Sequence, residues 1–88
     1  MGEQYRQVLE EKLRTLGGGE LRVYIDDASI SPHYRKHLEE TVLGSGAILV
    51  STREEANFVF DGESAPFDMP GVVTAFIANG QIEFRGAL

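Results

Sequence analysis

Four side chains in the first half of the sequence could bind a metal ion. Asp26 and Asp27 are adjacent carboxylates at the end of the apolar segment Leu21–Ile25, and His33 and His37 lie four residues apart shortly after them. Two imidazoles at i and i+4 on a helix can reach one ion, and paired carboxylates hold the cations that assist phosphoryl transfer. One hypothesis is therefore a small metal- or ligand-binding enzyme or sensor that uses these four residues.

The aspartate pair also has a purely structural interpretation. Tyr24-Ile25-Asp26-Asp27 resembles the Tyr-x-Asp-Asp signature of reverse transcriptases, whose chemistry needs a third aspartate on an upstream strand and a track for nucleic acid. Only 23 residues precede Tyr24, and the net charge of -6 would repel a phosphate backbone. The segment after Asp27 leads into a helix instead of a hairpin. We therefore expect the aspartates to end a strand and open a turn, and we expect no nucleic-acid partner.

The histidine pair has a similar alternative. His33, His37 and Glu40 share one flank of an expected helix, so a His-His-carboxylate site is geometrically possible. A closed zinc site needs a fourth ligand, and this HxxxH spacing lacks the adjoining glutamate base of the zinc proteases. We expect a solvated helix flank, with no metal and no cofactor.

The remaining sequence features do not indicate catalysis. Phosphate-binding loops connect a strand to a following helix, whereas the glycine runs 17–19 and 44–46 each follow an expected helix. No serine has the context of a nucleophile elbow, and the chain has no cysteine for thiol chemistry, disulfides or thiolate zinc sites. Ser29, Ser31, Ser45 and Ser64 all lack that context. We expect a protein that is not an enzyme.

Composition predicts one globular domain over residues 1–88. A hydrophobic content of 42% and a charged content of 25% are ordinary globular values. No apolar run approaches the roughly 20 residues of a membrane-spanning helix, so we expect no direct insertion into a membrane. If the chain is complete as given we expect a cytoplasmic protein, and if a leader preceded Met1-Gly2 we expect a periplasmic or envelope protein.

Hydrophobic spacing predicts a helix at residues 4–16, ended by the glycines that follow it, and a strand at residues 21–25. A second helix would begin with Ser31 as its N-cap and Pro32 at its first position. Gly44 suits its end. The segments "YRQVLEEKL" and "YRKHLEETV" in the two helices match at five of nine positions, through either convergence on one amphipathic pattern or an ancient duplication.

The second half predicts four more strands and a short turn. The continuous apolar run 47–50 is typical of a strand covered on both faces, and residues 57–61 form a strand after a single turn capped by Thr52 and Glu55. Asn79-Gly80 between two alternating segments predicts a type I′ hairpin, with Ile77 opposite Ile82 and Ala75 opposite Phe84.

These elements predict an α/β (α+β) fold with two layers. We expect a mixed sheet of about five strands, with two main helices packed on one face. Its order would be α-β-α-β-turn-β-β-β, with a right-handed βαβ crossover followed by an antiparallel meander.

The loop predicted at residues 62–71 carries a candidate partner-binding site. Phe67 and Met69 lie there among prolines and acidic residues. As an exposed apolar tip they could bind a protein partner, whereas Phe67 folded back over the core would act as a lid. Both interpretations stay open.

Two short motifs and the order of elements suggest a family. Ala56–Gly62 reads Ala-Asn-Phe-Val-Phe-Asp-Gly, and Gly80–Phe84 reads Gly-Gln-Ile-Glu-Phe. They resemble an Ala-Asp-aromatic-Val-Leu-x-Gly strand, here with Asn for Asp, and a Gly-Glu-Ile-x-Trp strand, here with Phe for Trp. Both strands are characteristic of a bacterial envelope superfamily that includes the TolB amino-terminal domain and the CsgG, LpoB and FlgO types of lipoprotein.

This resemblance implies a non-catalytic assembly or accessory domain that binds another protein or a second copy of itself. Members of the superfamily are usually larger and exported, and often carry a lipidated cysteine, which this chain lacks. A second likeness, to the first half of phosphopeptide-binding BRCT domains, ends after Gly62, where those domains continue with helices and a tryptophan.

Overall fold

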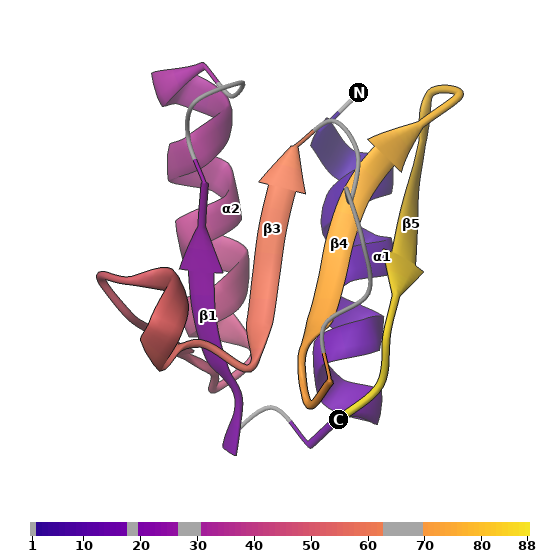
Figure 1. The fold of residues 1–88 in the computed structure, drawn as a ribbon. Coiled ribbons are helices and arrows are strands. Elements are labelled where there is room, and N and C mark those ends of the chain that lie inside the picture. The colour runs from indigo at the N-terminus through magenta and orange to yellow at the C-terminus, as the bar shows by residue number, and fades with distance from the viewer. Residues whose placement is uncertain (1, 18–19, 27–30, 63–69) are drawn as a thin grey trace.

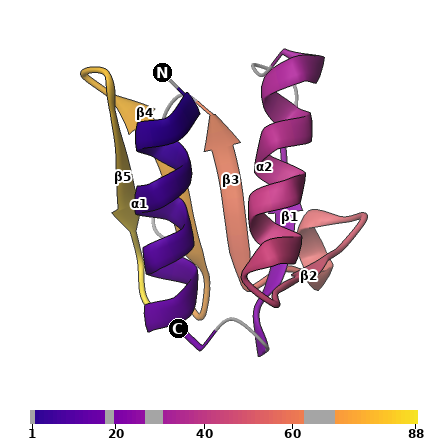
Figure 2. The ribbon, with the colours of Figure 1, turned by 180° about the vertical axis from the view of Figure 1, so that it is seen from behind.

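The helices lie on one face of a five-stranded mixed sheet, and Figures 1 and 2 show this arrangement from its two sides. The structure is a computed structural model and describes residues 2–17, 20–26, 31–62 and 70–88. In chain order the elements are α1 (Gly2–Thr15), β1 (Arg22–Ile25), α2 (Pro32–Gly44), β2 (Ile48–Leu49), the 3₁₀ turn η2 (Arg53–Glu55), β3 (Phe58–Gly62), β4 (Val73–Ala78) and β5 (Gln81–Arg85). The predicted two-layer α+β class is confirmed.

The strand order is β2-β1-β3-β4-β5. β1 pairs in parallel with β2 and β3, and β4 pairs antiparallel with β5. The expected antiparallel meander is wrong at one step, because β3 and β4 are parallel, with Phe58 opposite Val73 and Phe60 opposite Ala75. Ten residues separate Gly62 from Val73, and that length is enough chain to cross a strand of about 17 Å.

The core lies between the sheet and the two helices. In β3, Phe58 and Phe60 face the helices and are 0% and 1% exposed, while Val59 is buried on the opposite face. Full burial of an apolar side chain of this size contributes roughly 1.5–3 kcal/mol, so these residues anchor the fold. The other main members of the cluster are Leu9, Leu13, Leu21, Val23, Ile25, Leu38, Val42, Val73, Ala75 and Ile82.

The helix ends match the sequence predictions. α1 ends at Thr15, and Gly17 then adopts a positive φ of 87°. Ser31 caps α2, since its Oγ accepts a hydrogen bond of 3.2 Å from the Tyr34 backbone N–H, and Pro32 occupies the first helical position. α2 ends at Gly44, as predicted.

The hairpin prediction is also confirmed. Asn79 and Gly80 have φ values of 53° and 75°, the positive values that a type I′ turn needs at both positions. The pairing places Ile77 opposite Ile82 and Ala75 opposite Phe84.

The expected burial of the run 47–50 on both faces is wrong. β2 is the edge strand, and Ile48 is 53% exposed. Leu49 packs against the core on the helix side, whereas Ile48 lies on the face that carries no helix. A continuous apolar run is compatible with a central or an edge strand, since hydrophobicity does not say which neighbours a strand has.

Two glycine substitutions should change stability in opposite directions. Gly86 has a φ of 90°, and an added Cβ would collide with the Val72 carbonyl oxygen, so Gly86→Ala should destabilise the fold by about 1–3 kcal/mol. Gly44 is the last residue of α2 and has open space around it, so Gly44→Ala should stabilise by up to about 1 kcal/mol. Urea denaturation of both variants measures the difference, and equal midpoints would contradict the strain at Gly86.

Candidate functional site

Asp26 lies at the carboxyl end of β1, where its backbone N–H donates to the Phe60 carbonyl at 2.9 Å. Its carboxylate accepts a hydrogen bond of 2.8 Å from the Arg53 guanidinium. Arg53 comes from η2 and also lies over the Tyr24 ring, 5.7 Å from the ring centroid. Arg53 therefore joins η2 to the helix-free face of β1 through one ion pair and one cation–π contact.

This arrangement decides what Asp26 does in the fold. The carboxylate already has a cationic partner and the N–H is part of the sheet, which agrees with an aspartate that ends a strand. Asp27 lies outside the described residues, so the structure does not test the aspartate pair as a unit. Residue spacing does not predict Arg53 as the partner, because the two residues are 27 positions apart and only the fold brings them together.

The histidine pair is close in space. His33 and His37 are exposed on α2, their Nε2 atoms are 3.2 Å apart, and their ring planes cross at 84°. Among residues 2–17, 20–26, 31–62 and 70–88, no group of three or more His, Cys, Asp or Glu side chains is arranged to bind a metal ion. The structure therefore brings the two histidines together, but it does not join them to Asp26 in one site.

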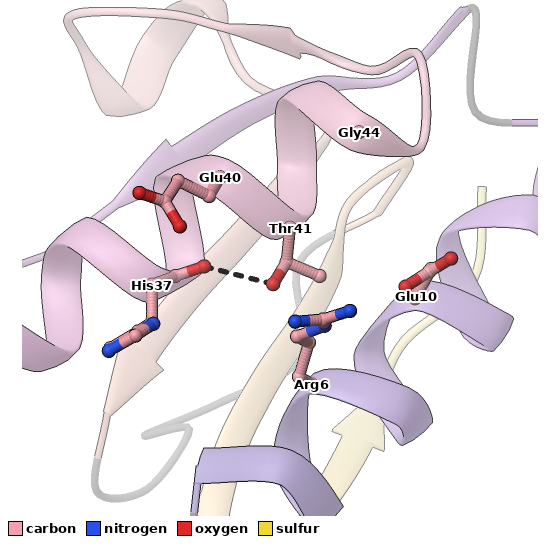
Figure 3. A pocket seen from close by; sticks show the side chains of 6 residues that line it. All are labelled: Arg6, Glu10, His37, Glu40, Thr41 and Gly44. Carbon is pink, nitrogen blue, oxygen red and sulfur yellow. Dashed lines mark hydrogen bonds between the residues drawn. The ribbon is translucent and has the colours of Figure 1, made fainter.

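A polar groove of about 290 Å³ lies between α1 and α2 (Figure 3). The hydroxyl of Thr41 donates to the His37 carbonyl at 2.9 Å, so it is held by the helix backbone. Glu10 pairs with Arg14 of its own helix. The groove is lined by Arg6, Glu10, His37, Glu40, Thr41 and Gly44. These lining side chains do not form a hydrogen-bonded nucleophile–base pair, so the groove offers a polar binding surface and no recognisable reaction chemistry.

The described surface has one more feature, which the sequence analysis missed. Leu43 at the end of α2 and Ile48 in β2 are 60% and 53% exposed, and they flank the same turn. The signal in the sequence is the uncharged run Ala47–Val50, whose hydrophobicity is equally compatible with a buried strand and with an exposed edge strand. Phe67 and Met69, the predicted partner-binding residues, lie outside the described residues.

Comparisons with protein-family models, with curated proteins and with solved structures find no match for this chain. The likeness to the envelope superfamily therefore rests on its short motifs and stays a prediction. Within the described part of the chain, neither helix is long and apolar enough to cross a membrane.

The ion pair between Asp26 and Arg53 should make a small, measurable contribution to stability. The two side chains are 28% and 35% exposed, and pairs of that kind contribute up to about 1 kcal/mol. A double-mutant cycle with Asp26→Ala and Arg53→Ala should therefore give a coupling free energy of about 0.5–1 kcal/mol by urea denaturation, decreasing at high salt. Additive single effects would show that the two residues act independently.

Proposed function

We propose that this chain is a non-catalytic assembly domain that associates with a second copy of itself through the edge strand β2. The observation that carries the proposal is an uncharged, apolar edge with Ile48 half exposed. Exposed apolar edge strands are templates for pairing with another strand. They present a row of unpaired N–H and C=O groups to hydrogen-bond with it, and apolar side chains that are buried when the strands pair.

The backbone of β2 determines where an added strand would bind. The N–H groups of Ile48 and Val50 donate to the carbonyls of Leu21 and Val23, each at 2.9 Å. In a parallel ladder the intervening residue, Leu49, directs its N–H and C=O away from β1. A second strand would therefore form its central hydrogen bonds with Leu49.

The side chains of this edge are complementary to themselves. An antiparallel pair with its two-fold axis at Leu49 would place Ile48 opposite Val50 of the second copy, and Val50 opposite the second Ile48. Both contacts join β-branched side chains, which stabilise cross-strand pairs, and neither brings charges together.

The opposite edge of the sheet lacks this complementarity. β5 exposes Gln81, Glu83 and Arg85. Self-pairing over its full length would place Glu83 directly opposite Glu83 of the second copy, and like charges at that position are destabilising. Charged side chains on an edge strand are also a common protection against edge pairing. These charges favour β2 over β5 as the assembly edge.

The expected association is reversible. β2 has two residues, so the contact buries less than the roughly 1,600 Å² of a standard interface. We therefore expect a dimer that forms as concentration rises and dissociates on dilution. The likeness to envelope assembly proteins supports a role in assembly. The cellular compartment of the protein and the binding of a partner by Phe67 and Met69 stay predictions.

Sedimentation velocity over a range of about 10 µM to 1 mM, the range in which weak dimers form, tests the proposal. The wild-type chain should shift from monomer to dimer, and Ile48→Lys should remain monomeric because it places a charge in the contact. Val8→Lys is the matched control, because Val8 is 42% exposed on α1, away from β2, and this variant should dimerise as the wild type does.

A folding check keeps this experiment decisive. Urea midpoints of Ile48→Lys and Val8→Lys should be similar, since both positions are exposed. Ile48→Thr, which keeps a β-branched side chain but loses apolar area, should weaken dimerisation less than lysine does. A wild-type chain that stays monomeric at the highest concentration, or equal effects of the two lysine variants, would refute the β2 interface.

A further inference from the structure

The two histidines of α2 have the separation of a chelating pair. Their Nε2 atoms are 3.2 Å apart. A tetrahedral ion with bonds of about 2.0–2.1 Å to imidazole nitrogen holds adjacent donor atoms about 3.3–3.4 Å apart. The two nitrogens also contact each other, and the ring that donates in this contact would have to change tautomer before both Nε2 lone pairs could face one ion.

The helix holds this geometry before any ligand arrives. His33 and His37 are at i and i+4, so their side chains leave the same face of α2. α2 itself is fixed by its Ser31 cap and by the buried Leu38 and Val42 on its core side. Donor atoms on a rigid element lose less freedom on binding than donors on a loop.

The electrostatic surroundings of the two histidines contain one feature that disfavours a bound cation and two that favour it. His33 is the second residue of α2, where the positive end of the helix dipole disfavours a cation. Glu40 lines the same groove as His37 (Figure 3), so its carboxylate adds negative potential nearby, and the whole chain has a net charge of -6. Both histidines are exposed, so water screens the unfavourable dipole.

The geometry points to an open metal site in which His33 and His37 bind one Zn²⁺ or Ni²⁺ ion through their Nε2 atoms. Imidazole nitrogen suits these ions, whereas Mg²⁺ and Ca²⁺ prefer oxygen ligands. Two protein ligands leave the other coordination positions for water or for a donor group on a binding partner. The site is separate from the β2 edge and does not depend on dimerisation.

Isothermal titration of the full chain with Zn²⁺ and with Ni²⁺, in a non-coordinating buffer at pH 7.5, tests the site. We expect one ion per chain with a dissociation constant below about 100 µM, no uptake of Mg²⁺, and weaker binding at lower pH as protons compete for the imidazoles. In NMR spectra, Zn²⁺ should shift the ring signals of both histidines together. A lack of uptake at this concentration would overturn the proposal.

Three variants separate a chelate from independent histidines. His33→Ala and His37→Ala should each weaken binding by about tenfold or more, because the second ligand binds intramolecularly in the wild type. The double variant His33→Ala with Lys36→His keeps two histidines, but at adjacent positions that do not face each other. It should bind no better than His33→Ala, and wild-type affinity in this variant would overturn the proposal.

Discussion

The parallel pairing of β1 with β3 is the constraint on which the rest of the structure depends. Its register places Val23 beside Phe58 and Ile25 beside Phe60, so the helix-facing side chains of the two central strands form one apolar layer. α1 and α2 both pack on that layer, and the pairing also brings the chain after β2 back across β1. The contact of Arg53 with Asp26 and Tyr24 follows from the same pairing, because η2 lies directly before β3.

What the sequence predicted correctly is local. The cap at Ser31, the helix end at Gly17 and the type I′ turn at Asn79-Gly80 are determined by a few consecutive residues whose backbone preferences are strong. What it predicted wrongly depends on contacts between distant segments. The parallel direction of β4 and the edge position of β2 are set by which strands become neighbours, and hydrophobic spacing carries no information about that choice.

The candidate sites show the same division. Spacing alone placed His33 and His37 on one helix face, and the structure confirms their proximity because an i,i+4 relation is local. Asp26 was recognised as the end of a strand, but its partner Arg53 could not be found from spacing. Asp26 does not join the two histidines in a metal-binding group of the described residues, and Asp27 lies outside those residues.

The two edges of the sheet explain why assembly is a better proposal than catalysis. A sheet in a small two-layer domain ends in two strands with free backbone groups, and each edge must be protected or used. β5 carries charges along its exposed side, including Glu83 at its centre, whereas the outer side of β2 carries only apolar residues. An apolar edge without charges favours pairing with another chain, and this difference in charge is why we propose β2 and not β5 as the edge that pairs. The groove between the helices gives no comparable argument, since its hydroxyl is bonded to the helix backbone and its Glu10 to Arg14.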